Sequence, residues 1–132
     1  MDTIRMRKLM LLFVFLTVSG SITAITLDED YMQTMEDRQK SLSANIGIQN
    51  AKGANEDAGA MIEMFSEVSA YYLKKGNAQD AVDWSNESRE LATVIIKYLA
   101  GKDYDNATVS ATKMAKTCKD CHRLYKKEKE NK

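Results

Sequence analysis

Two cysteines and a histidine fall within the segment Cys118-Lys119-Asp120-Cys121-His122, near the end of a 132-residue chain that has no other cysteine or histidine. On a helix, side chains three residues apart lie on one face, so both thiols can reach the same edge of a flat ring. This spacing is the C-x-x-C-H pattern of covalent c-type haem attachment. In that chemistry the two thiolates add to the vinyl groups of the porphyrin and the histidine binds the iron.

Three other roles for these residues are weaker. A thioredoxin-like redox pair lies next to a strand, and nothing around Cys118 has a strand pattern. A zinc site needs four ligands, so a carboxylate would have to complete a set of two thiolates and one imidazole. A disulfide between residues three apart would strain a helix. We expect one haem c, held by Cys118 and Cys121 with His122 on the iron.

Composition excludes several other classes of function. The chain has 19 Lys plus Arg against 19 Asp plus Glu, so it lacks the positive charge typical of nucleic-acid binding. The sequence contains no paired acid and base, no Ser/His arrangement and no glycine-rich phosphate loop, so hydrolysis and phosphoryl transfer have no residues to use. We therefore expect a protein that is not an enzyme.

The first 24 residues have the pattern of a secretory signal. Three basic residues precede the apolar run from Leu9 to Val18, which is too short to span a bilayer, and Ile22-Thr23-Ala24 offers a cleavage site. We expect residues 1–24 to be removed and residues 25–132 to form one domain in the bacterial periplasm, with no membrane insertion afterwards. An uncleaved membrane anchor is the alternative.

Apolar residues repeat at helical spacing through the remaining chain, and no proline interrupts them. Four amphipathic helices are expected: from about Leu27 to Gln49, from about Glu56 to Lys75, from a cap at Asn77 to about Ala100, and from near Asp103 to Asn106 onward. The turns are expected at Lys52 to Asn55, at Gly76 and at Gly101. Helices of about 20 residues with short connections favour an all-α, antiparallel, up-down-up-down four-helix bundle.

The first and last of these helices carry the residues that would surround a ring. The inward face of the first helix holds Leu27, Tyr31, Met35, Leu42 and Ile46. One continuous face of the last helix holds Ala111, Met114, Cys118, Cys121, His122 and Tyr125. Ordinary core packing is the default interpretation of the methionine and aromatic positions.

A signal segment, four helices and C-x-x-C-H in the final helix together resemble the class II cytochromes c, the group of cytochrome c′ and its low-spin, methionine-ligated relatives. The resemblance covers almost the whole mature chain. Its most specific part runs from Cys118 to Lys126, where the aromatic Tyr125 precedes a basic residue. Family members usually have arginine where this chain has Lys126, so the resemblance implies a haem propionate contact from Lys126 but not a bidentate one.

In this family one residue of the first helix controls the sixth coordination position of the iron. The segment from Met32 to Met35 resembles the methionine-ligated members, with Met35 as ligand and Met32 as its substitute. The segment from Arg38 to Leu42 instead resembles the Arg-Gln-x-x-Leu of five-coordinate members, with Leu42 over an open site. We favour Met35, because about four and a half turns of helix then remain before the expected turn. Arg38 is the candidate for a propionate contact from this helix.

The resemblance implies a monohaem cytochrome that transfers single electrons between periplasmic donor and acceptor proteins. The alternative is a five-coordinate haem protein that binds nitric oxide or another small gas. A helical bundle with an ordinary disulfide is a third interpretation. No nucleic-acid partner is expected, and the sequence leaves open whether two bundles form a homodimer.

Overall fold

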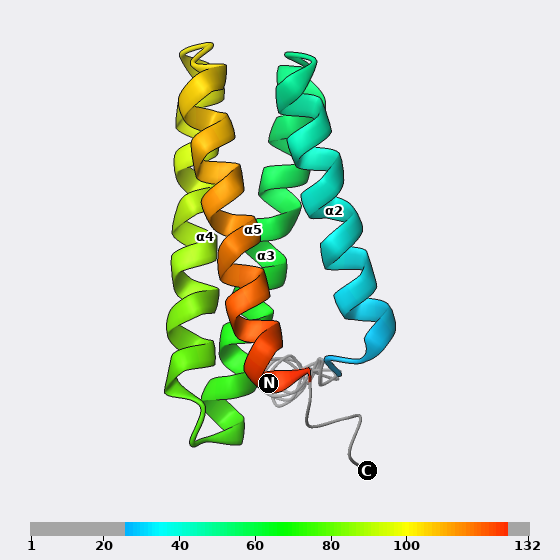
Figure 1. Cartoon of the computed structure of the whole chain (residues 1–132), viewed down its shortest axis with the longest axis vertical. Helices are drawn as coiled ribbons and strands as arrows, with labels where there is room; N and C mark the ends of the chain where they lie inside the picture. The colour runs from blue at the N-terminus through cyan, green and yellow to red at the C-terminus, as the bar shows by residue number, and fades with distance from the viewer. Residues whose placement is uncertain (1–25, 127–132) are drawn as a thin grey trace, which may run out of the picture.

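The computed structural model describes residues 26–126, and all regular structure within that range is helical. Four helices follow one another: α2 Glu29–Gly47, α3 Ala51–Lys75, α4 Gln79–Ala100 and α5 Tyr104–Tyr125. Figure 1 shows the chain reversing its direction along the long axis at each connection. The expected all-α fold of four packed helices is confirmed for these residues. The expected signal segment, residues 1–24, lies outside the described range.

Several helix ends are where the sequence indicates. Asp28 precedes α2, and its carboxylate accepts a hydrogen bond from Tyr31 N at 2.8 Å. Asp103 precedes α5 and accepts from Asn106 N at 3.1 Å. Both carboxylates satisfy N–H groups that a helix start leaves without a partner. Gly76 ends α3 with φ 76°, a conformation that glycine adopts without strain.

The second helix begins earlier than expected. Lys52 to Asn55 was expected to be a turn, but α3 starts at Ala51 and includes that segment. Asn50 caps the helix, since its Oδ1 accepts from Gly53 N at 3.2 Å. A Cβ atom at Gly53 would lie 2.7 Å from Asn50 Nδ2, too close for a real side chain. The glycine therefore lets polar side chains approach the helix and does not end it.

Asn77 is not the cap of α4 that the sequence suggested. Ala78 occupies that position and makes no side-chain capping hydrogen bond. Asn77 instead adopts φ 54°, in the left-handed region that asparagine tolerates better than most residues. Asp80 takes over part of the capping role, because its carboxylate accepts from Ala81 N at 2.9 Å. The expected boundary is right, but the residue that performs the capping is different.

All four helices contribute to one apolar core. The largest apolar side chains that are almost fully buried are Leu42, Ile46, Met61, Ile95 and Met114. Met35, Phe65, Val68, Tyr72 and Leu99 belong to the same core. These positions follow the helical periodicity of the sequence. Trp84 and Leu91, which lie on the apolar stripe of α4 in the sequence, are only half-buried.

A buried carboxylate joins α2 to α3. Asp57 accepts hydrogen bonds from Arg38 Nη1 at 2.9 Å, Ser41 Oγ at 2.6 Å and Asn45 Nδ2 at 2.9 Å. Burial alone would raise the pKa of Asp57, but these three donors outweigh burial and lower it. The carboxylate is therefore charged at neutral pH and holds the second half of α2 in place.

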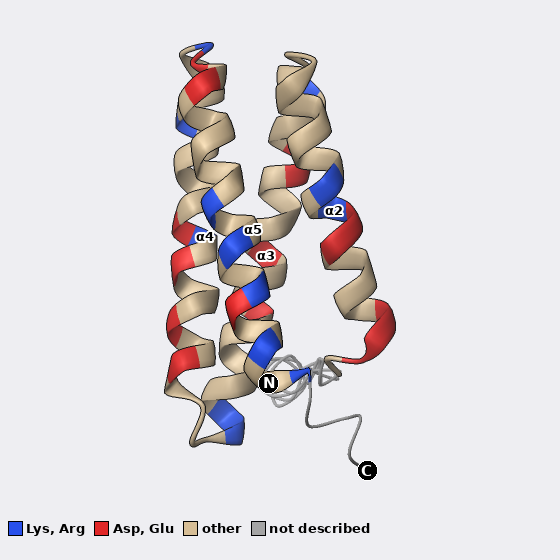
Figure 2. Ribbon diagram, in the orientation of Figure 1, with Lys and Arg blue, Asp and Glu red and all other residues tan. Residues whose placement is uncertain are grey.

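The backbone of the first half of α2 diverges from the other helices, although its side chains still pack against the core. Figure 1 and Figure 2 show the ribbon of α2 beside α3 at the α2–α3 connection and moving away from it toward the first turn of α2, while α3 packs extensively against α4. α2 also packs less extensively against α5 than any other pair of neighbouring helices in the structure. Within residues 26–126, none of the helices is long and apolar enough to cross a membrane.

Candidate functional site

α5 carries the Cys118 to His122 segment near its C-terminal end. The helix continues without a break to Tyr125, so Cys118 and Cys121 lie about one turn apart on one side. Both are free thiols, half-buried, and packed against the apolar core. His122 is also half-buried. The structure thus places the three predicted residues together on a continuous helix.

Burial keeps these three groups neutral. Burial is the largest cause that raises the pKa of Cys118 and of Cys121 to about 11. Burial also lowers the pKa of His122, the positive charge of Lys126 lowers it further, and Glu36 opposes both. A neutral imidazole has the free lone pair that a metal needs. Without a bound group, the segment holds two protonated thiols and one neutral imidazole at neutral pH.

One hydrogen bond fixes how α2 lies against α5. Gln39 Nε2 donates to the carbonyl oxygen of Ala111 at 3.1 Å. Because the two helices run in opposite directions (Figure 1), residues before Gln39 face residues after Ala111. Met35 is therefore displaced from Gln39 by about one turn toward Cys118, and Leu42 by about one turn in the opposite direction.

Electrostatic effects agree with this register. Glu36 of α2 contributes to raising the pKa of Cys118 and opposes the lowering of the pKa of His122. The carboxylate therefore lies within interaction range of both α5 groups. Met35, the preceding residue, is buried with 7% of its surface exposed, and Met32 is half-buried against the same core.

The two predicted propionate contacts have different surroundings. Arg38 already has a protein partner, because its Nη1 lies 2.9 Å from Asp57 Oδ1, although 48% of its side chain is exposed. Lys126 follows the last residue of α5 and is exposed, with its backbone N–H bonded to the carbonyl of His122 at 2.9 Å. A contact with a haem propionate remains a prediction for Arg38 and for Lys126.

Two tyrosine–carboxylate contacts between helices have no signal in the sequence. The hydroxyl of Tyr31 donates to Glu67, which is 36 residues away along the chain. The hydroxyl of Tyr125 donates to Asp80, which is 45 residues away. Both contacts join different helices, so local periodicity could not reveal them.

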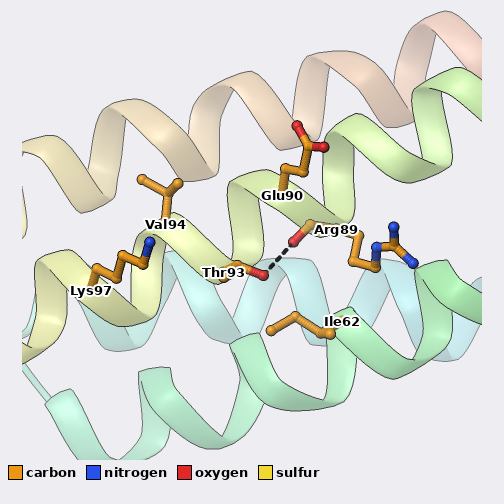
Figure 3. Close-up of a pocket in the computed structure, with 6 residues that line it drawn as sticks. All are labelled: Ile62, Arg89, Glu90, Thr93, Val94 and Lys97. Carbon is orange, nitrogen blue, oxygen red and sulfur yellow. Dashed lines mark hydrogen bonds between the residues drawn. The ribbon is translucent and has the colours of Figure 1, made fainter.

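A surface hollow of about 510 Å³ lies elsewhere, between α3 and α4. Figure 3 shows the side chains that line it: Ile62, Arg89, Glu90, Thr93, Val94 and Lys97. None of them comes from α2 or α5, and they include no cysteine or histidine, so we assign it no role. Among residues 26–126, no three His, Cys, Asp or Glu side chains gather as a metal site. An iron ligand pair of histidine and methionine would not form such a group.

No protein-family model, curated protein or solved structure matches this chain. The site must therefore be judged from its own residues. Two free thiols on consecutive turns, a neutral imidazole beside them and an apolar surrounding fit the covalent attachment of a flat, iron-containing ring. Met35 adds a buried thioether on the facing helix, and thioethers are soft iron ligands.

Proposed function

We propose that this protein is a monohaem c-type cytochrome that transfers single electrons between periplasmic redox proteins. The observation that carries the proposal is the continuous helix through Cys118 to Tyr125, which leaves both thiols unbridged on one side and holds His122 beside them. A thioredoxin-like pair would not lie in the interior of a helix. The resemblance to class II cytochromes c, with the motif in the last of four helices, points to the same function.

In this proposal Cys118 and Cys121 would hold the haem through thioether bonds, and His122 and Met35 would bind its iron. The register set by Gln39 and Ala111 supports Met35, because it displaces Met35 toward the cysteines. The same register displaces Leu42 away from them, which is unfavourable for a five-coordinate site covered by leucine. When bound, haem c supplies the one-electron Fe(III)/Fe(II) couple.

The chain's own contribution is to hold both oxidation states in one geometry. Cys118, Cys121 and His122 would hold one side of the ring from a single helix. The buried residues of the core exclude water from that side, and exclusion of water is one of the properties that set the reduction potential. A rigid frame of this kind suits electron transfer, since little has to move when the charge on the iron changes.

Expression of the full chain in a bacterium that attaches c-type haem tests the proposal directly. We expect a red protein whose mass is increased by one haem and whose haem resists extraction with acid and acetone. The double variant Cys118→Ala/Cys121→Ala should lose the covalent haem. A colourless wild-type product from a host that matures a control cytochrome would overturn the proposal.

The ferric visible spectrum then tests the sixth ligand. We expect a low-spin wild type that becomes high-spin in Met35→Leu, since leucine keeps the volume but removes the thioether. Met61→Leu is the matched control, because Met61 is fully buried in α3 and should leave the spectrum unchanged. A low-spin Met35→Leu protein together with a high-spin Met32→Leu protein would move the ligand to Met32. A high-spin wild type that binds carbon monoxide rapidly would favour the gas-binding alternative.

A further inference from the structure

Tyr125 joins the last turn of α5 to the ends of two other helices. Its hydroxyl donates to Asp80 in the first turn of α4. Its ring lies against the ring of Tyr72 in the last turn of α3, with centroids 4.9 Å apart. The hydrogen bond to Asp80 raises the pKa of Tyr125 to about 12, so the hydroxyl keeps its proton at neutral pH. His122 is three residues away, and a movement of this turn would move its imidazole.

Tyr31 makes the corresponding contact for α2. It is half-buried in the first turn of the helix, where its hydroxyl donates to Glu67 of α3 and lies 3.3 Å from the carbonyl oxygen of Met64. Burial and the Glu67 carboxylate both raise the pKa of Tyr31. Met35 is four residues further along, on the same face of α2. This is the half of α2 whose backbone diverges from the other helices (Figure 1).

Both contacts lie where the bundle is expected to be weakest. Helix ends open more easily than helix interiors, because fewer backbone and packing interactions hold them. The first turns of α2 and the last turn of α5 are such ends, and they lie at the same end of the bundle (Figure 1). Each tyrosine bonds its own turn to α3 or α4, the two helices that pack most extensively against each other.

We propose that Tyr31 and Tyr125 are positioning residues for the two haem ligands, each holding the end of a helix that carries one ligand against a helix that carries none. The inference rests on the proposed function, because it assigns Met35 and His122 as ligands. It adds that α3 and α4 act as the fixed frame, while α2 and α5 bring the ligands to it. Without these contacts, each ligand would be as mobile as its helix end.

Single hydroxyl deletions in the haem-loaded full chain test this role. Tyr31→Phe and Tyr125→Phe keep the ring and remove the donor. Tyr104→Phe is the matched control, because the Tyr104 hydroxyl donates to the carbonyl of Gln49 at 3.3 Å, at the opposite end of the bundle. Glu67→Gln keeps an acceptor oxygen for Tyr31 and should behave nearly as wild type.

The readouts report on the ligands separately from overall stability. Loss of a hydrogen bond to a charged group should speed amide hydrogen exchange about tenfold, at residues 32–36 in Tyr31→Phe and at residues 122–126 in Tyr125→Phe. Tyr31→Phe should also speed the replacement of the methionine ligand by cyanide about tenfold. Tyr125→Phe should shift the paramagnetic proton resonances of the His122 ring. Tyr104→Phe should change none of these.

The possible failures can be told apart. A wild-type chain that carries no covalent haem overturns the proposed function and, with it, the ligand-positioning role. A haem-loaded wild type whose Tyr31→Phe and Tyr125→Phe variants match Tyr104→Phe in exchange, cyanide binding and His122 resonances overturns the positioning role alone. Lower stability towards urea with unchanged ligand readouts counts against the role as well, because it indicates a purely structural contact.

Discussion

Arg38 of α2 forms an ion pair with Asp57 of α3, with 2.9 Å between Nη1 and Oδ1, and the carboxylate of that pair is buried. The residue that the sequence suggests for a haem propionate therefore already has a partner within the protein. Its guanidinium is about half exposed, so it can donate to a second anion. The pair fixes α2 just after the turn that carries Met35, and this makes it important for the site as well as for the fold.

Asp57→Ala should destabilise the protein by about 2 kcal/mol at pH 7, because three donors lose a buried acceptor. The folded-state pKa of Asp57 lies below its unfolded value, so its contribution is present above the unfolded pKa and is lost as the pH falls through the folded value. Urea unfolding of wild type and variant should therefore differ most near pH 7 and converge in acid. Asp83→Ala, which removes an exposed carboxylate, should cost less than about 0.5 kcal/mol. A gap between wild type and Asp57→Ala that does not depend on pH would contradict this assignment.

Arg38→Met and Lys126→Met test the propionate contacts in the haem-loaded protein. A nearby cation favours the less positive, reduced form of the haem, so removal of either should lower the reduction potential. Since the Lys126 side chain is exposed and the Arg38 side chain is about half exposed, each effect should correspond to less than about 1 kcal/mol. Lys102→Met, in the α4–α5 connection at the far end of the bundle, is the control for a change in net charge. A potential equal to that of the control would show that the residue has no contact with a propionate.

Leu42→Ala separates core packing from ligation. Leu42 is fully buried, so truncation should cost about 3 kcal/mol of unfolding free energy. The ferric spectrum of the variant should nevertheless stay low-spin, because the register places Leu42 away from the cysteines. Ile48→Ala, at a side chain that is 75% exposed, should change stability by less than about 0.5 kcal/mol. A change in iron spin state on truncating Leu42 would instead support the five-coordinate interpretation.

Local signals in the sequence account for most of the fold. Apolar periodicity located the four helices, and Asp103 and Gly76 marked two of their ends correctly. The errors in the predicted helix ends concern residue types that occur in more than one kind of local structure. Gly53 was interpreted as a helix breaker, but the side chain of Asn45, brought close by the fold, occupies the space that a Cβ would need. Asn77 suited a cap but adopts a left-handed turn conformation instead.

The same distinction between local and long-range signals applies to the candidate site. The spacing of Cys118, Cys121 and His122 is local, so the sequence alone predicts their common face on α5. The contact between Gln39 and Ala111 joins residues 72 positions apart, and it depends on how α2 and α5 pack along their whole length. The sequence favoured Met35 only through the length of helix before the expected turn, whereas the register between α2 and α5 supports it through a contact that residue spacing within one helix cannot reveal.

Alkylation of the cysteines in the haem-free chain tests the state of the site before haem attachment. Since thiolates are the reactive form, raising the pKa of Cys118 and Cys121 to about 11 should slow their reaction with iodoacetamide at pH 8 by about two orders of magnitude. The full chain, produced in a host without c-type attachment machinery, can be followed by intact mass in the folded state and in urea. The folded protein should react slowly, with a rate that rises until the pH approaches 11, whereas the unfolded chain should react readily at pH 8. Equal rates in the two states would mean that the folded helix does not protect the thiols. If the chain carries the proposed haem, the thioether bonds would then form before α5 packs against the core, because the unpacked chain has the larger fraction of reactive thiolate.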